Sequence, residues 1–273
     1  MKKKSIIEIK ELFKYSMFTL RKIRGDHLFS DIDDKNREQV IENIIEASTP
    51  RKSFFAVVAV SAIVCTAGLI MNSVALIIGA MLIAPILSAI LSISLGIVVR
   101  NFKLFYRSVL VFLKAVLLLF ISAFSISMFF DVSDGILFEF LLKKGFELEI
   151  FIVSLVVGFI AALSFIRKEL SQYISGTAIA VTLIPPVCVS GIALKMGYRD
   201  YFLDALLIFF INFLGIMISS IAVFLVTKFY KSKSRVVQEL CEEERLLEKL
   251  SRKERFKKWL LEGIQLLKKL LRR

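Results

Sequence analysis

The chain has 273 residues, of which 57% are hydrophobic, with a mean hydropathy of +0.74 and a formal net charge of +13. It contains several apolar runs of about twenty residues or more, the length that spans a bilayer core, which excludes an ordinary soluble domain. The first residues are lysine-rich and lead into a mixed segment without an uncharged apolar core or a cleavage site, which excludes a secretory signal peptide.

Residues 1–50 form a polar, amphipathic N-terminal segment that we expect to be helical and cytoplasmic. Its stretch "SDIDDKNREQVIENIIEAS" has the pattern of a capped helix that ends before Pro50. The apolar residues Val40, Ile41, Ile44 and Ile45 share one face of this helix. We expect the helix to pack on its own bundle or to lie at the cytoplasmic surface.

Six apolar segments follow, and each is predicted to be a transmembrane helix. Together they define an all-α polytopic membrane domain over residues 51–230. The six segments cover residues 54–72, 74–99, 105–130, 149–166, 173–194 and 202–227.

Basic residues gather on one side of these segments: before the first, in "RNFKLFYR" between the second and third, at Arg167 and Lys168, and after Thr227. The other side carries few basic residues and several acidic ones. Positive charge marks the cytoplasmic side of a membrane protein, so we expect both termini in the cytoplasm. The same asymmetry accounts for the net charge, and we expect no nucleic-acid partner.

Residues 231–273 form a basic amphipathic tail. Its leucines recur at spacings of three or four, with lysines and arginines between them. This pattern fits either an interfacial helix on the anionic inner leaflet or a helix that associates with copies of itself. The stretch "SRKER" at 251–255 interrupts the apolar pattern and favours two shorter helices over one coiled coil.

Two stretches resemble each other: "ALIIGAMLIAPILSAI" at 75–90 and "TAIAVTLIPPVCVSGI" at 177–192. Each runs through small residues to a proline, and each lies in the middle member of a set of three spans. By the charge argument the two sets enter the membrane in opposite directions. The sequence therefore predicts two inverted three-helix repeats whose second and fifth helices are broken by proline.

A proline in a membrane helix leaves a carbonyl without its usual partner, and a neighbouring helix, hydroxyl, water or ligand must satisfy it. Matched breaks of this kind point to a binding site at the middle of the membrane. The alternative is that the prolines are simple kinks, and that Asn212 bonds to a neighbouring helix. The candidate substrate-binding residues are Pro85, Ser88, Thr177, Thr182, Pro185, Pro186 and Asn212.

The second span also carries a small residue at every fourth position, which predicts close approach of another helix. The partner of this ridge is either the fifth span or a second copy of the second span. Its members are Ala80, Ala84, Ser88, Ser92 and Gly96.

Catalytic and metal-binding signatures are missing from the sequence. It contains no Gly-x-Ser-x-Gly, no His-Glu-x-x-His and no phosphate-binding glycine loop, so we expect no enzyme and no cofactor. The single histidine, His27, lies near several aspartates whose spacing matches no metal-ligand motif. Cys65, Cys188 and Cys241 are expected to be reduced thiols.

The pair "SVALIIGAMLIAPILSAILSISLGI" and "SGTAIAVTLIPPVCVSGIAL" resembles the signature of a family of multi-pass prokaryotic membrane proteins that is catalogued as a domain of unknown function, the 389 family. The resemblance covers roughly residues 50–230. It implies a membrane core of several helices in the cytoplasmic membrane of a bacterium or archaeon, and it implies no particular activity.

Two functions remain open from the sequence. The first is a transporter or channel-like permeation pathway for a small ion or polar solute, lined at the proline breaks. The second is a non-transporting homo-oligomeric scaffold, in which the small-residue ridge and the basic tail hold subunits and membrane lipids together.

Overall fold

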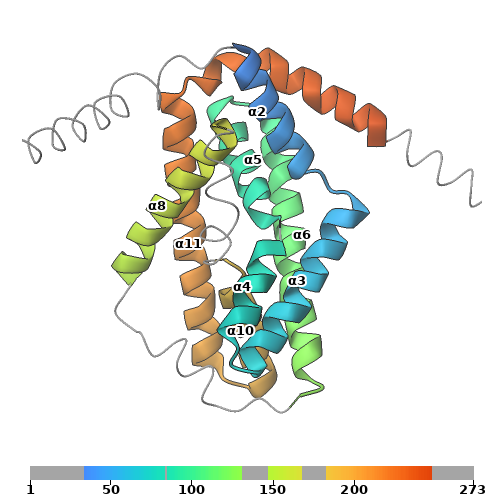
Figure 1. Ribbon diagram of the computed structural model, residues 1–273, viewed down its shortest axis with the longest axis vertical. Helices are drawn as coiled ribbons and strands as arrows, with labels where there is room; N and C mark the ends of the chain where they lie inside the picture. The colour runs from blue at the N-terminus through green and yellow to red at the C-terminus, as the bar shows by residue number, and fades with distance from the viewer. Residues whose placement is uncertain (1–33, 84, 131–146, 168–182, 248–273) are drawn as a thin grey trace, which may run out of the picture.

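The computed structural model describes residues 34–83, 85–130, 147–167 and 183–247, and every regular element in these ranges is a helix (Figure 1). A helix that we call the tail helix covers residues 233–247. The other helices are α2 (Asp34–Ala47), α3 (Lys52–Ile70), α4 (Val74–Ile83), α5 (Ile86–Val98), α6 (Phe102–Ser127), α8 (Glu147–Ile166), α10 (Ile184–Met196), α11 (Arg199–Val226) and the short 3-10 helix η2 (Phe229–Ser232).

Four of these helices, α3, α6, α8 and α11, are long and apolar enough to cross a membrane. They confirm the apolar helices expected for the first, third, fourth and sixth segments, with ends shifted by a few residues. Helices α4 and α5, which are bent by 47° relative to each other, would make a fifth span if they are counted together. Helix α10 is shorter, with 13 residues. The first part of the predicted fifth span, 173–182, lies outside the described residues.

The outer surface of the bundle is apolar. Large side chains such as Leu117 and Phe210 are more than half exposed, whereas small residues such as Ala115 and Ala123 are fully buried. A continuous apolar surface of this kind marks contact with a membrane or a partner rather than with water. Together with the length of the helices, it indicates a membrane-embedded protein.

Helices α6 and α11 organise the packing. Both α5 and α10 pack against each of them, while α3 packs on α6 and α8 packs on α11. Helices α3 and α4 form a hairpin whose turn contains Asn72 in the left-handed conformation, with φ of 51°. Asparagine tolerates this conformation better than most residues, as expected for a tight turn.

Helix α2 is inserted among the other helices rather than lying apart from them. It contacts α5, α8 and η2, and its apolar face, Val40, Ile41, Ile44 and Ile45, is buried in one cluster with residues of α5, α8 and α11. Figure 1 shows α2 and the tail helix at the same end of the bundle. The two ends of the described chain therefore lie on one side.

Candidate functional site

The prolines named in the sequence lie at the starts of two short helices. Pro85 is the N-cap of α5, and Pro185 and Pro186 lie in the first turn of α10. The first amides of a helix have no partner within the helix, so proline is well tolerated there and fixes the backbone angle for the turn. Pro85 therefore lies at the break between α4 and α5, and all three prolines lie at the starts of helices.

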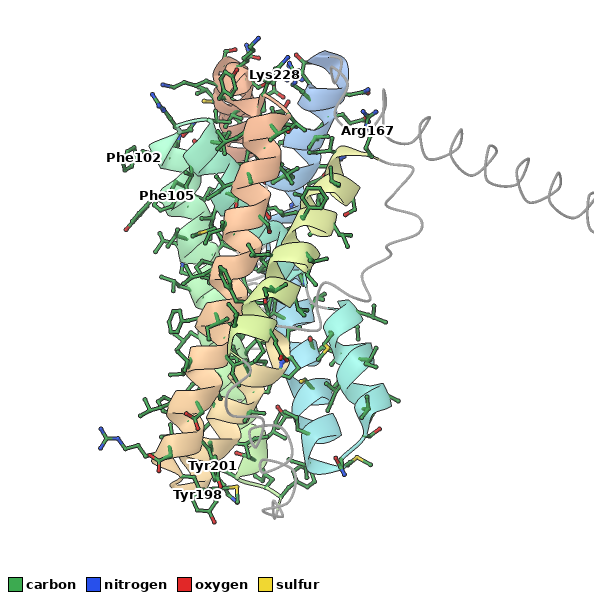
Figure 2. All side chains as sticks on the ribbon, turned by 90° about the vertical axis from the view of Figure 1, so that its left-hand side faces the viewer. Phe102, Phe105, Arg167, Tyr198, Tyr201 and Lys228 are labelled. Atoms are coloured by element: carbon green, nitrogen blue, oxygen red, sulfur yellow. The ribbon has the colours of Figure 1, made fainter. Side chains whose placement is uncertain are left out.

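The two short helices point in opposite directions along the bundle. Helix α5 ends beside Phe102 at the end that carries Arg167 and Lys228, which we call the basic end (Figure 2). Helix α10 ends beside Tyr198 at the other end, where Lys195 Nζ donates to the carbonyl of Phe130 at 3.4 Å. Their N-termini are therefore both directed towards the middle of the bundle.

Contacts with α6 fix the depth of the two N-termini. Ser92 of α5 bonds to Ser108 of α6 at 2.8 Å, and a Cβ on Gly191 of α10 would lie 2.9 Å from the carbonyl oxygen of Phe120. At a rise of 1.5 Å per residue, the start of α5 lies about 9 Å before Ser92, and the start of α10 lies about 10 Å before Gly191. Along α6, Ser108 and Phe120 are about 18 Å apart, which nearly equals the sum of these two lengths. Both helices therefore begin at about the same level, near the fully buried Ala115.

Serine hydroxyls satisfy backbone carbonyls close to the junction of α4 and α5. Ser61 of α3 donates to the carbonyl of Ala80 in α4 at 2.6 Å. Ser88 donates to the carbonyls of Pro85 at 2.7 Å and Ala47 at 2.9 Å. A carbonyl without a partner is costly in a membrane, and these hydroxyls supply the donors. The hydroxyl of Ser88 also ties the end of α2 to the start of α5.

The other candidate substrate-binding residues are placed as follows. Pro185 and Pro186 are buried, whereas Pro85 is partly exposed. Asn212 is 3% exposed in α11 and accepts a hydrogen bond from Ser154 of α8 through its side-chain oxygen. It therefore lies between α8 and α11. Thr177 and Thr182 lie outside the described residues.

The seam between α8 and α11 is the feature that sequence reasoning missed. A Cβ on Gly158 would lie 2.5 Å from Ile216 Cα, and a Cβ on Gly215 would lie 2.6 Å from the Cβ of Ser154. These glycines let the two backbones approach more closely than any side chain would permit. The signal was present, because Ser154 and Gly158 continue to Ala162 at four-residue spacing.

The small-residue ridge of the predicted second span does not form one continuous surface. Ser92 and Gly96 face α6, where a Cβ on Gly96 would lie 2.9 Å from the nitrogen of Phe105. Ser88 bonds to the end of α2, and Ala80 lies in α4 against α3. The prediction that the ridge packs against the fifth span or a second copy of the second span is therefore wrong for the ridge residues in α5. The 47° bend separates Ala80 from the members in α5, and along α5 itself the neighbour changes from α2 at Ser88 to α6 at Ser92. Ala84 lies outside the described residues.

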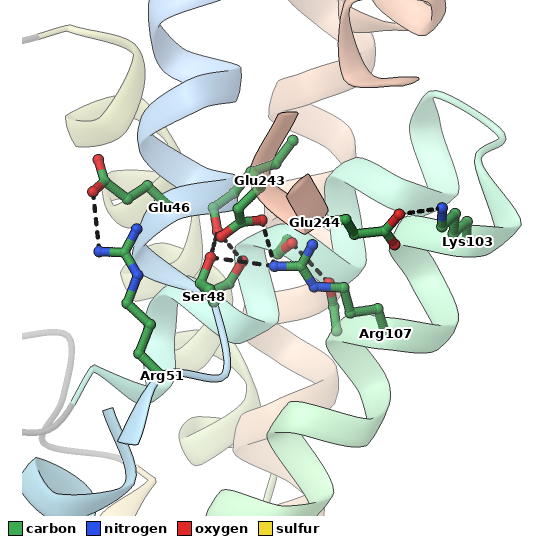
Figure 3. A network of polar contacts seen from close by, with 11 residues as sticks. Glu46, Ser48, Arg51, Lys103, Arg107, Glu243 and Glu244 are labelled. Atoms are coloured by element: carbon green, nitrogen blue, oxygen red, sulfur yellow. Dashed lines mark hydrogen bonds and ion pairs between the residues drawn. The ribbon is translucent and has the colours of Figure 1, made fainter. Parts of the chain in front are cut away.

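Polar contacts join three elements at the basic end (Figure 3). Arg107 of α6 pairs with Glu243 of the tail helix and donates to Thr49, in the link between α2 and α3, at 3.2 Å. Lys103 pairs with Glu244 at 2.7 Å. Desolvation raises the pKa of Glu243, and its bond to Arg107 opposes that rise. The buried pair fixes the tail helix and the link to the start of α6.

Metal-ligating side chains do not cluster in the described part of the chain, where no three His, Cys, Asp or Glu residues are placed to hold an ion. His27 lies outside it. Cys65 of α3 and Cys188 of α10 are buried free thiols that lie close to each other. This contact adds to the packing of α10 against α3.

Residues 81–218 match the family described as a domain of unknown function (DUF389). The match covers half of the chain, and the protein belongs to this family. An uncharacterised protein of the archaeon Methanocaldococcus jannaschii is 28% identical over 190 residues, which are 69% of this chain and 58% of the relative. The chain thus matches a little over half of that relative's length. No solved structure matches the chain.

Proposed function

We propose that the protein is a transporter or channel-like permeation pathway for a small ion or polar solute. The observation that carries this proposal is the pair of helices α5 and α10, which start at the same depth and run to opposite ends of the bundle. In secondary transporters, discontinuous helices of this kind present their ends to substrate near the middle of the bilayer. The N-terminus of each helix, which is the positive end of its dipole, would face the middle of the bundle.

The proposal includes six spans arranged as two inverted repeats. In such a repeat α3 would correspond to α8, α5 to α10 and α6 to α11. The packing agrees with this for most helix pairs, because α3 packs on α6 as α8 packs on α11, and α5 and α10 each pack on both α6 and α11. In this arrangement α4 and α5 form the second span, and α10 is the second half of the fifth. The basic end faces the cytoplasm under the positive-inside rule, which places both termini there.

Flux through liposomes tests the proposal. The purified full chain is reconstituted, and the movement of K⁺, Cl⁻ and glycerol is measured against empty liposomes. We expect at least one probe to move, and we expect Pro185→Ala with Pro186→Ala to reduce that flux by about tenfold or more, because the positions of the helix ends would change. The matched control is Ile97→Ala, a change at an outward-facing position of α5 that is 40% exposed.

The alternative function is an oligomeric scaffold that organises subunits and lipid without transport. One observation favours it: Pro185 and Pro186 are both buried by packed helices. If none of the probes moves, and the proline variants change only thermal stability, the scaffold is the better explanation. A defined oligomer in nanodiscs, measured by mass photometry, would then be expected.

A further inference from the structure

A cavity at the basic end lies between α2 and the last residue of the described α8 segment. Its volume is about 170 Å³, and its lining includes Arg167, three amide side chains of α2 and apolar residues of both helices. In Figure 2 Arg167 lies at the end of α8 beside α2. The cavity is distinct from the starts of α5 and α10, and the proposed transport function does not use it.

Two nitrogens of Arg167, Nε and Nη2, are buried and have no hydrogen-bond partner among the residues that the structure describes. These two N–H groups lie on the same side of the planar guanidinium, where they form a fork that matches the two oxygens of a carboxylate or phosphate. Arginine cannot lose its charge, so burial cannot be relieved by deprotonation. A buried fork without a partner is the state expected of a site whose ligand is an oxyanion.

The remainder of the lining supports this chemistry. Asn36, Gln39 and Asn43 recur along one face of α2 and supply amide N–H donors, and the described residues that line the cavity include no carboxylate. The neighbouring acid Glu38 pairs instead with Arg235, at 3.9 Å. In the described part of the lining, an anion would therefore meet the permanent positive charge of Arg167 and neutral donors.

The size of the cavity limits the ligand. Sites for drug-sized ligands occupy about 300–1,000 Å³, well above the volume found here. The cavity therefore suits a single oxyanion group rather than a nucleotide. We infer that Arg167, Asn36, Gln39 and Asn43 form a binding site for a phosphate or carboxylate group, which bridges α2 to the end of α8.

The test uses the full chain in nanodiscs of neutral phosphatidylcholine. Calorimetry and thermal melting measure binding of inorganic phosphate, and acetate serves as the carboxylate probe. Chloride at the same ionic strength is the reference. We expect phosphate or acetate to bind and raise the melting temperature where chloride does not, because a ligand that binds only the folded state stabilises it.

Variants assign the binding to the fork. Arg167→Gln should weaken phosphate binding by about tenfold or more, and Arg167→Lys should not restore it, because an ammonium group is a point charge without the fork. The matched control is Arg100→Gln, an exposed arginine at the same end with no ion pair among the described residues; its affinity should equal that of the wild type. If Arg167→Gln does not fold, Asn43→Leu at the exposed edge of the cavity takes its place.

Nanodiscs that contain phosphatidic acid separate two sources of the same group. If this lipid competes with added phosphate, the ligand is a lipid headgroup; if it does not, the ligand is a free anion. Equal phosphate affinity in the wild type and in the Arg167→Gln or Asn43→Leu variant would overturn the inference. So would a wild type that responds to phosphate and acetate no more than to chloride.

Discussion

In chain order the apolar helices form a first half, α3 to α6, and a second half, α8 to α11. The helices of the two halves pack against each other in different ways. In the second half, α8 and α11 meet along a seam where Gly158 would place a Cβ 2.5 Å from the backbone of Ile216. In the first half, the pair α3 and α6 has no glycine with such a contact among the described residues; Gly68 of α3 instead lies against Ile77 of α4. The second half is therefore held by direct backbone contact, which leaves little room for movement.

Helix α2, which precedes the apolar helices in the chain, links the two halves by contacting both α5 and α8. Helix α10 contacts α3 directly. The hydroxyl of Ser88 holds the end of α2 against α5. The ion pair of Arg107 with Glu243 holds the tail helix against the start of α6. We conclude that α8 and α11 form a fixed unit through direct backbone contact, while α2 is attached by side chains, namely its buried apolar face and its bond from Ser88.

The largest expected effect comes from filling the seam. A side chain at position 158 would meet Ser219 Oγ at 2.2 Å as well as the backbone of Ile216. We expect Gly158→Leu to lose about 3 kcal/mol or more of stability, because overpacking here must push two backbones apart. The matched control is Gly79→Leu in α4, where nothing lies within 4 Å of the added Cβ. Melting of both variants in detergent measures the difference, and equal losses would contradict a fixed seam.

The next effect concerns the buried ion pair at the basic end. Arg107→Gln removes the partner of Glu243, whose side chain is only 9% exposed, and leaves a buried carboxylate. We expect a loss of about 2–4 kcal/mol, because a buried charge without its partner keeps its desolvation cost. Adding Glu243→Gln should recover most of it. A double variant as unstable as Arg107→Gln alone would show that Arg107 acts through other contacts.

This second prediction has a definite pH dependence. The pKa of Glu243 is raised mainly by desolvation, so the folded protein holds this proton more tightly than the unfolded chain does. Its contribution to stability is then largest below the unfolded pKa and is lost as pH rises through the raised folded pKa. Without Arg107 the rise should be greater. We therefore expect Arg107→Gln to cost more at pH 8 than at pH 5, measured by melting at both values.

The sequence predicted which segments form apolar helices better than it predicted how those helices pack against one another. Apolar runs long enough for a bilayer identified α3, α6, α8 and α11, because span length is set by membrane thickness. The small-residue ridge was read as one surface, although Ser92 and Gly96 face α6 while Ser88 meets α2. A four-residue spacing predicts close contact without naming the partner, and the neighbour changes along α5 itself, from α2 at Ser88 to α6 at Ser92.

Prediction of the candidate sites was limited for a related reason. The prolines marked the starts of α5 and α10 because proline suits the first turn of a helix. Asn212 was placed in the membrane by its position in the sequence, but only the structure pairs it with Ser154 across the α8–α11 seam. The cavity at Arg167 depends on α2 and α8, which are far apart in the chain. No local pattern brings such residues together.

The smallest expected effect tests how weakly α2 is held. Ser88 has one hydroxyl proton for two carbonyls, that of Ala47 at the end of α2 and that of Pro85 in its own chain segment. Ser88→Ala removes the bond to α2 but leaves the apolar face of α2 in place. The cost should therefore be about 1 kcal/mol or less, the net worth of one hydrogen bond.

Hydrogen exchange measures this effect separately in the two halves. We expect amides of α2 in the Ser88→Ala variant to exchange up to about fivefold faster, while those of α8 and α11 keep their wild-type rates, because local opening follows the weakest contacts. The matched control is Ser190→Ala, since among the described residues that hydroxyl bonds only to the carbonyl of Val187 in its own helix, at 2.7 Å. If α2 and α11 accelerated together, α2 would open only with the whole bundle, and the contrast between a fixed seam and a separable α2 would be wrong.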